Sequence, residues 1–163
     1  MTIRQRPAAL ITGAAKRLGL ASAETAAANG YDIALHYNQS AEAARDEAAR
    51  LRRTYGVECA TFQADLANAA AVQQLASNAI AQFPRLALLI NSASVFNRSQ
   101  MLEETDEFVA ETLQVNLLAP WQLSRLCAAH WQQYAGDDDG NGLIINFSDQ
   151  RVTRSAQGHF AYN

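Results

Sequence analysis

The sequence has few cysteines, few histidines and no metal-ligand spacing, and these shortages exclude several kinds of site. Cys59 and Cys127 are the two cysteines among 163 residues, so a disulfide-stapled scaffold and a cysteine-rich zinc site are excluded. Both cysteines lie in apolar segments, and we expect buried free thiols in a reducing, cytoplasmic compartment. The three histidines are scattered along the chain, and we expect no metal site.

Charge of one sign and long apolar runs are also lacking. The formal net charge is −3, which leaves no broad basic surface for nucleic acid or an anionic membrane. No run approaches the roughly 18 apolar residues of a membrane-spanning helix, and residues 1–10 lack the apolar core of a signal peptide. The composition that remains, 49% hydrophobic and 18% charged, is typical of a globular protein. We expect residues 1–163 to form a single domain of ordinary size.

Short apolar runs alternate along the chain with longer, alanine-rich segments of helical period. Strands are expected at 8–12, 32–37, 57–63, 86–91 and 143–148. Helices are expected at 18–30, 41–56, 68–83 and 106–134, with Ser40 capping the second and Pro120 bending the last. This alternation predicts an α/β fold with a parallel sheet covered by helices on both faces. The right-handed crossover rule then favours a doubly wound sheet of strand order 3-2-1-4-5.

The segment ITGAAKRLG joins the first expected strand to the first expected helix. At such a place a helix N-terminus offers free N–H groups and the positive end of its dipole to a phosphate. Gly13 permits a tight turn there, and Gly19 permits close packing of the helix on the strand. Lys16 and Arg17 add cations where the dipole disfavours them unless an anion is bound. The pattern indicates a dinucleotide-binding turn, with an ordinary turn of small residues as the alternative.

This turn resembles the fingerprint T-G-x-x-x-G-x-G of the short-chain dehydrogenase/reductase family. Thr12 matches it together with Gly13 and Gly19, whereas Arg17 replaces the middle glycine. The form TGAAKRLG is similar to that of the pteridine reductase branch. The resemblance implies a Rossmann fold, a nicotinamide dinucleotide as cofactor, and cofactor contacts from Gly13, Lys16, Arg17, Leu18 and Gly19.

The second expected strand ends in HYNQS, which contains no carboxylate. A protein that selects NAD usually places Asp or Glu there to bind the ribose 2′-hydroxyl, whereas Asp32 lies at the other end of the strand. The polar side chains of this stretch can donate hydrogen bonds to a 2′-phosphate, so NADPH is the expected cofactor; the alternative is simply a polar strand end. The stretch also resembles the HYxxS of pteridine reductases, which assigns to the cofactor site the residues His36, Tyr37, Asn38 and Ser40.

Two further motifs resemble cofactor contacts of the same family. ADL follows the third expected strand, and its aspartate, Asp65, corresponds to a residue that contacts adenine; alternatively, Asp65 caps the next helix. NSASVF follows the fourth strand and is similar to the N-N-A-S-x-F of pteridine reductases. Small residues here would let the backbone approach the cofactor ribose. The resemblance adds to the cofactor site Asp65, Leu66, Asn91, Ser92 and Ala93.

The residues that the resemblance assigns to substrate and catalysis lie further along. Phe96 would offer a flat face to a pterin, with Ser94 and Arg17 beside it; the alternative is a core aromatic. Asn116, in VNLLAP, matches the helical asparagine that positions a water in the family; read alone, it is an interior polar residue bonded to backbone. These assignments are what the resemblance implies.

The last motif, at the end of the chain, concerns proton transfer. Tyr162 begins a Y-x-x-x-K motif in which the family uses the tyrosine as general acid. Thirteen residues earlier, where most members carry serine, stands Asp149, as in pteridine reductases; alternatively, it is a turn aspartate bonded to its own backbone. The motif's lysine would be residue 166, beyond Asn163. The chain therefore resembles the first two thirds of a reductase without its C-terminal strands, and we expect this fragment alone to lack normal turnover.

Taken together, the resemblance implies an NADPH-dependent reductase that converts a dihydropterin, such as dihydrobiopterin, dihydromonapterin or dihydrofolate, to its tetrahydro form. Two alternatives stay open: a general short-chain reductase acting on a carbonyl, and a non-catalytic module that binds NADPH. The expected partners are a small pterin-like substrate and further copies of the same chain, since the resembling family is usually tetrameric. No nucleic acid or membrane partner is expected.

Overall fold

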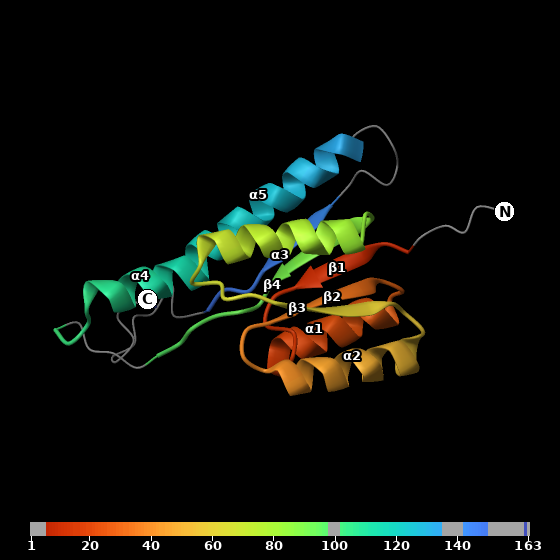
Figure 1. The fold of residues 1–163 in the computed structure, drawn as a ribbon, viewed down its shortest axis with the longest axis horizontal. Coiled ribbons are helices and arrows are strands. Elements are labelled where there is room, and N and C mark those ends of the chain that lie inside the picture. The colour runs from red at the N-terminus through yellow and green to blue at the C-terminus, as the bar shows by residue number, and fades with distance from the viewer. Residues whose placement is uncertain (1–5, 98–101, 135–141, 150–161, 163) are drawn as a thin grey trace.

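The computed structural model describes residues 6–97, 102–134, 142–149 and 162, in which five strands form one parallel sheet (Figure 1). The strands are β1 (Ala8–Ile11), β2 (Asp32–Tyr37), β3 (Cys59–Gln63), β4 (Leu86–Asn91) and β5 (Leu143–Asn146). Their order is β3-β2-β1-β4-β5, and every neighbouring pair is parallel. The α/β fold and the strand order expected from the sequence are therefore confirmed. Residues 1–5, which carry half of the segment examined for a signal peptide, lie outside the described part.

Helices cover both faces of this sheet, because each central strand is apolar on both of its faces. The helices are α1 (Arg17–Ala28), α2 (Ala41–Tyr55), α3 (Ala69–Gln82), α4 (Asp106–Leu113) and α5 (Ala119–Trp131). In β1, Ala9 and Ile11 pack into a core with α1 and α2, whereas Ala8 and Leu10 pack into a second core with α3 and α5. Figure 1 shows these two helical layers on opposite sides of the strands. The alternation along one strand thus builds both cores.

Two helix ends follow local sequence signals, whereas one expected cap does not form. Asn68 caps α3, and its side-chain oxygen accepts the N–H groups of Ala70 and Ala71. Gly56 ends α2 in the left-handed conformation, with φ of 65°. Ser40 occupies the position before α2, but its side chain makes no capping hydrogen bond. The expected cap is wrong in this respect, because Ser40 adopts a φ of −88° and ψ of 55° rather than the extended conformation usual for a cap.

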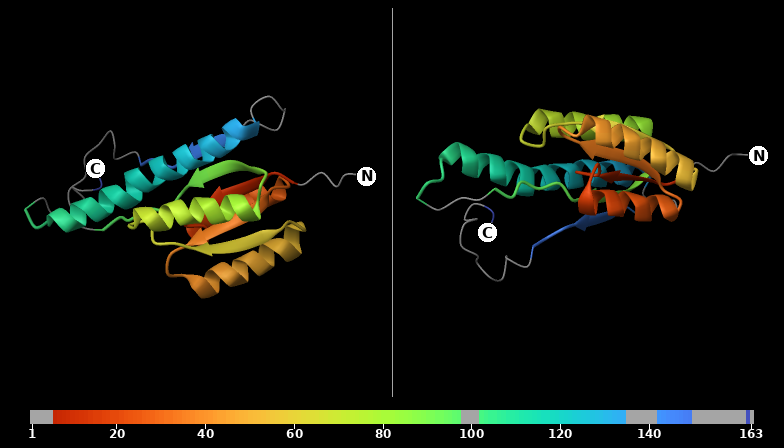
Figure 2. Two further views of the ribbon diagram at one scale, coloured as in Figure 1. Left: turned by 45° about the horizontal axis from the view of Figure 1, so that its top comes forward. Right: turned by 90° about the horizontal axis from the view of Figure 1, so that it is seen from below.

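The expected long helix at 106–134 contains one turn of π-helix at Gln114–Leu118, between α4 and α5. The expected bend at Pro120 is corrected: the irregular turn lies before the proline, which falls in the first turn of α5, where its missing N–H is tolerated. Figure 2 shows α4 and α5 continuing along one line in both views. Turns of π-helix are frequent at functional sites, and this one contains Asn116.

The far end of α5 is fastened to the amino-terminal end of β4. His130 is buried, and its Nε2 lies 2.9 Å from the carbonyl oxygen of Pro84. Trp131 donates its indole N–H to the carbonyl of Leu86, at 2.6 Å. Two ring hydrogen bonds therefore hold this end of the helix at the edge of the sheet where the strands begin.

The two cysteines are free and buried, as expected. Burial raises the pKa of the Cys59 thiol to about 11 and that of the Cys127 thiol to about 12. Both thiols therefore stay protonated at neutral pH and are poor nucleophiles. In the part of the chain that the structure describes, no helix has the length and apolarity to cross a bilayer.

Candidate active site

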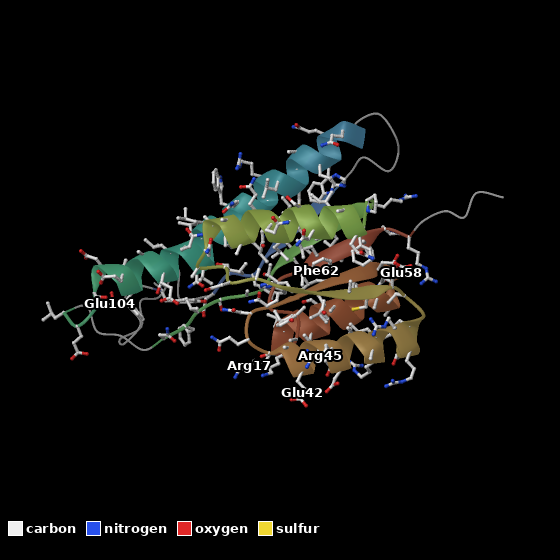
Figure 3. All side chains as sticks on the ribbon, viewed as in Figure 1. Arg17, Glu42, Arg45, Glu58, Phe62 and Glu104 are labelled. Atoms are coloured by element: carbon white, nitrogen blue, oxygen red, sulfur yellow. The ribbon has the colours of Figure 1, made fainter. Side chains whose placement is uncertain are left out.

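The carboxyl ends of the parallel strands meet at one edge of the sheet, and the loops that leave this edge carry most of the predicted site residues. Ligands of open parallel sheets bind at this edge. Figure 3 labels Arg17 at this edge, beside the start of α1, and Glu58, which precedes β3, at the opposite edge. The site is therefore assembled by topology from segments that are far apart in the sequence.

The turn between β1 and α1 requires glycine at two positions. Gly13 has a φ of 65°, and a Cβ placed on it would lie 3.1 Å from the Cα of Ala93. A Cβ on Gly19 would lie 2.3 Å from the carbonyl oxygen of Gly13, which is too close for any side chain. The first glycine lets the turn pass the loop after β4, and the second lets α1 begin directly against that turn. Both roles agree with the expectation from the sequence.

Arg17 occupies an unusual backbone conformation in this turn. Its φ is 53°, and it is the one non-glycine residue with positive φ among the described residues. For an L-residue this conformation costs roughly 1–2 kcal/mol. The position is the one where the family fingerprint has its middle glycine, so the structure gives a physical reason for glycine there. Arginine is thus held at a backbone cost, at a helix start that also disfavours its charge.

The start of α1 suits a bound phosphate. No side chain caps this N-terminus, and its first turn contains no acidic residue. Lys16 and Arg17 are exposed beside it, and so is Leu18, at 53%. Free N–H groups, a positive dipole end and two cations therefore converge on this turn. These residues fit the diphosphate of a dinucleotide.

Thr12 joins this turn to the loop after β4. It is buried, and its hydroxyl oxygen accepts the N–H groups of Ser92 and Ala93, both at 3.0 Å. From the sequence, Thr12 is recognised only as part of a fingerprint, without a role of its own. The sequence signal for this role is the position of Thr12 directly after a buried strand, because a buried hydroxyl needs hydrogen-bond partners. One side chain thereby fixes the spacing of two predicted cofactor loops.

His36 lies elsewhere than its predicted role requires. The sequence predicts a hydrogen bond from His36 to a 2′-phosphate, but the ring is 1% exposed. Its Nδ1 accepts the N–H of Gly13 at 3.1 Å, and its Nε2 lies 3.1 Å from the carbonyl oxygen of Ala64. The side chain is therefore unable to reach a phosphate outside the sheet, and that expectation is corrected. Burial lowers the pKa of His36, so the imidazole is neutral at pH 7.

The residues after His36 are open to solvent. Asn38 is exposed, and Tyr37 and Ser40 are partly exposed. The side chain of Asn38 lies 3.5 Å from Oδ1 of Asp65, so the loops after β2 and β3 meet. The structure thus places these predicted 2′-phosphate and adenine contacts next to each other, and their roles stay predictions.

Asp65 does not cap α3, which rules out the alternative considered for it. Its Oδ1 accepts the N–H of Ala67 at 3.0 Å, within the loop before the helix, and the cap is Asn68. Leu66, the next residue, is buried against the α3 core. The loop after β3 is therefore held in shape by its own side chains, with the carboxylate of Asp65 exposed.

Asn91 and Asn116 brace the loop after β4. Asn91, at the end of β4, donates from Nδ2 to Oδ1 of Asn146 at the end of β5, at 2.8 Å. Asn116 accepts the N–H of Val95 and donates to the carbonyl of Val95, both at 2.9 Å. This matches the alternative of an interior polar residue bonded to backbone. The role of positioning a water, which the family resemblance implies for Asn116, stays a prediction.

Three residues predicted to contact the substrate lie together at the end of β5. The hydroxyl of Tyr162 is 3.5 Å from Oδ2 of Asp149, a long hydrogen bond. The rings of Phe96 and Tyr162 meet edge to face, with centroids 4.8 Å apart. Phe96 is 43% exposed, and Ser94 is exposed as well. A hydroxyl, a carboxylate and an aromatic face therefore surround one place beside the predicted cofactor loops.

Known proteins are similar to this chain in sequence and in fold. D-threitol dehydrogenase of Mycolicibacterium smegmatis is 34% identical, over 94% of this chain and 56% of that enzyme. Pteridine reductase 1 of Leishmania tarentolae is 28% identical, over 96% of this chain and 65% of that enzyme. A solved short-chain dehydrogenase from Sphingobium yanoikuyae, in complex with NADPH, superimposes with a TM-score of 0.84 at 28% identity, over 96% of this chain and 58% of that one.

The chain thus spans less than two thirds of the length of these relatives. The model of the family described as short chain dehydrogenase matches residues 7–163, which include the turn between β1 and α1, the loop after β4 and the pair Asp149 and Tyr162. This chain belongs to the short-chain dehydrogenase family.

Proposed function

We propose that the protein is an NADPH-dependent reductase whose substrate is a dihydropterin. The observation that carries this proposal is the carboxylate of Asp149 next to the hydroxyl of Tyr162, beside the exposed ring of Phe96. A carbonyl substrate needs a hydrogen-bond donor at this place, whereas the ring nitrogen of a pterin needs a group that also passes on a proton. The 28% identity to a pteridine reductase supports the same substrate class.

NADPH as the cofactor rests on the charge of the two loops that would hold it. The turn at Lys16 and Arg17 suits a diphosphate, and the end of β2 carries Asn38 and Ser40 but no carboxylate that would repel a 2′-phosphate. The solved relative from Sphingobium yanoikuyae contains NADPH. The other cofactor contacts proposed here come from Leu18, Tyr37 and the loops after β3 and β4.

The proposed chemistry adds a hydride and a proton across a C=N bond of the pterin. NADPH, when bound, supplies the hydride to the ring carbon and leaves as NADP⁺. Tyr162 gives its hydroxyl proton to the ring nitrogen, and Asp149 then passes a proton taken up from solvent to the tyrosinate, directly or through water. Phe96 holds the flat pterin ring, while Arg17 and Ser94 bind its polar edge. The protein thereby provides orientation and the proton.

Replacing Asp149 with serine tests the substrate class. We expect Asp149→Ser to lower kcat/KM for a dihydropterin by about 10²-fold, because the proton relay is lost while a hydroxyl donor remains. For a simple ketone the same change should leave kcat/KM within about threefold, because a serine hydroxyl can still donate a hydrogen bond to a carbonyl. The measurement is steady-state NADPH oxidation with both substrates, on the protein at the full length encoded by its gene.

Asp46→Ser is the matched control for this change, since Asp46 is an exposed aspartate on α2, away from the site. It should affect neither substrate. Equal losses on pterin and ketone for Asp149→Ser would contradict the assigned relay. Ketone turnover that exceeds pterin turnover in the wild-type protein would favour the second candidate, a general carbonyl reductase. The 34% identity to D-threitol dehydrogenase supports that candidate.

Arg17→Gly should separate stability from binding. Removing the side chain relieves a left-handed conformation worth roughly 1–2 kcal/mol, against an entropy cost of roughly 0.5–1 kcal/mol for glycine. We therefore expect the free energy of unfolding to stay equal or to rise by up to about 1 kcal/mol. NADPH should bind about tenfold more weakly, because a cation beside the diphosphate is lost. Urea unfolding and fluorescence titration at two salt concentrations measure both effects.

Arg45→Gly serves as the comparison, because it removes an exposed arginine from the interior of α2, where φ is ordinary. It should lower stability by about 1 kcal/mol and leave NADPH affinity unchanged. If Arg17→Gly also lowered stability and spared NADPH binding, the proposed role of Arg17 would fail.

Association into homo-oligomers, a tetramer in the parent protein, is part of the same proposal. Large apolar side chains are exposed along the outer side of the α4–α5 segment, namely Leu113, Leu117, Leu118 and Trp121. Exposed apolar groups of this kind are typical of contact surfaces between proteins. The free, buried thiols of Cys59 and Cys127 support a reducing, cytoplasmic location.

A further inference from the structure

We propose that His36 is a positioning residue. Its neutral ring connects the turn between β1 and α1, which would bind the diphosphate, to the loop after β3. The ring thereby sets the geometry in which both loops bind one dinucleotide. The ring lies inside the sheet edge, between Gly13 on one side and Ala64 on the other. This role differs from a direct contact to the cofactor, and it rests on the NADPH binding proposed above.

The partners of the ring leave one tautomer. The carbonyl oxygen of Ala64 can only accept, so Nε2 of His36 must carry the hydrogen. The N–H of Gly13 can only donate, so Nδ1 must be the bare nitrogen. An imidazolium would set an N–H against the N–H of Gly13, and the opposite tautomer would break both hydrogen bonds. Backbone groups on two loops therefore fix the ring as the neutral Nε2–H form.

The main chain of His36 holds the same turn a second time. Its carbonyl oxygen accepts the N–H of Ala14 at 2.9 Å, while its ring accepts the N–H of Gly13. Two consecutive amides at the start of the turn are thus committed to one residue of β2. The amides that remain for a phosphate are those further on, at the start of α1. His36 thereby determines which part of the turn faces the ligand.

The other end of the ring fixes the adenine side. Ala64 immediately precedes Asp65, the predicted adenine contact, and its N–H is donated to the carbonyl of Tyr37 at 3.1 Å. The peptide groups of Ala64 are therefore both bound to the end of β2. A shift of the ring would move the loops after β1 and β3 together. The distance between the sites proposed for the diphosphate and the adenine depends on the relative positions of these two loops.

Two variants of His36 distinguish the two contacts of its ring. His36→Phe keeps a flat ring of similar size without nitrogen, and we expect it to raise the Kd for NADPH at least about tenfold. His36→Asn can place Oδ1 where Nδ1 was, so it restores the acceptor for Gly13 but does not reach Ala64; its Kd should lie between wild type and the Phe variant. The measurement is a fluorescence titration of each variant with NADPH itself.

His130→Phe is the matched control. His130 is also buried and bonded to a backbone carbonyl, that of Pro84, but at the opposite edge of the sheet. It should lower the melting temperature and leave the Kd for NADPH unchanged. Equal NADPH affinity in the wild type, His36→Phe and His130→Phe would overturn the proposal for His36 while leaving the proposed cofactor intact.

Measurements without cofactor test the positioning role of His36 separately from the proposal that NADPH is the cofactor. ¹⁵N NMR of the imidazole should show a bare Nδ1 and a protonated Nε2 at neutral pH, and hydrogen exchange of the Gly13 amide should be faster in His36→Phe than in His130→Phe. Failure of the wild type to bind NADPH, with these results obtained, would refute the cofactor assignment alone and leave the positioning of the two loops in place. The opposite tautomer, or unchanged exchange at Gly13, would refute the role of His36.

Discussion

Tyr162→Phe is expected to lower kcat for dihydropterin reduction by about 10²–10⁴-fold, the usual contribution of a positioned general acid. The hydroxyl of Tyr162 lies next to Asp149, and the change removes that proton donor while it keeps the ring. The edge-to-face contact with Phe96 needs only the ring, so substrate should still bind. Single-turnover rates of NADPH oxidation, measured on the full-length gene product, give the effect on the chemical step.

The same variant should leave the Kd for NADPH within about twofold. Tyr31→Phe is the control for loss of a tyrosine hydroxyl, since Tyr31 is partly buried and precedes β2, at the edge of the sheet opposite the site. It should leave kcat unchanged. A Tyr162→Phe enzyme with near-normal kcat would show that another group donates the proton, and the assignment of Tyr162 as general acid would be abandoned.

Gly19→Ala is expected to abolish most cofactor binding. The new Cβ would lie 2.3 Å from the carbonyl oxygen of Gly13 and 3.1 Å from the Cα of Ala14, and all these are backbone atoms that have no rotamer to change. The turn must move to accommodate it, at a cost of about 1–3 kcal/mol in the free energy of unfolding. Because the turn itself would hold the diphosphate, the Kd for NADPH should rise well over tenfold. Calorimetric titration and urea unfolding measure the two quantities.

Gly56→Ala provides the matched loss of stability. Its added Cβ would meet nothing within 4 Å, but the φ of 65° makes alanine strained there by roughly 1–2 kcal/mol. We expect this variant to unfold more easily and to bind NADPH as the wild type does. If both glycine variants weakened NADPH binding equally, general destabilisation would explain the effect. The proposed need for close packing of Gly19 on Gly13 in NADPH binding would then be refuted.

Much of the fold could be predicted because burial leaves a clear periodic pattern. The strands are short apolar runs such as the one in β4, and the helices between them are amphipathic or alanine-rich, so the order of elements and the sheet topology follow. The pairing of Asp149 with Tyr162 was also accessible, because their spacing matches a family motif. The strands, the helices and the family motif could be predicted because each is defined by residues that lie close together in the sequence.

The errors arose where a side chain is defined by contacts distant in sequence. The sequence predicts that His36 donates a hydrogen bond to a 2′-phosphate, although His36 lies two residues after Ala34 and so on a buried face of β2. Its partners, Gly13 and Ala64, are 23 and 28 residues away. Likewise, the π-helical turn before Pro120 contains Asn116, whose hydrogen-bond partner Val95 is 21 residues away, and no local sequence pattern predicts this turn. The periodic spacing of apolar residues predicts strands and helices, but it does not predict hydrogen bonds between loops.

The fastening of α5 by His130 and Trp131 at the start of β4 has a practical consequence for protein engineering. The groups proposed to react or to hold the cofactor lie at the other end of the sheet. We therefore expect thermostabilising substitutions near His130 and Trp131 to leave the proposed turnover unchanged. A directed-evolution campaign on this scaffold can treat its two ends as separate libraries.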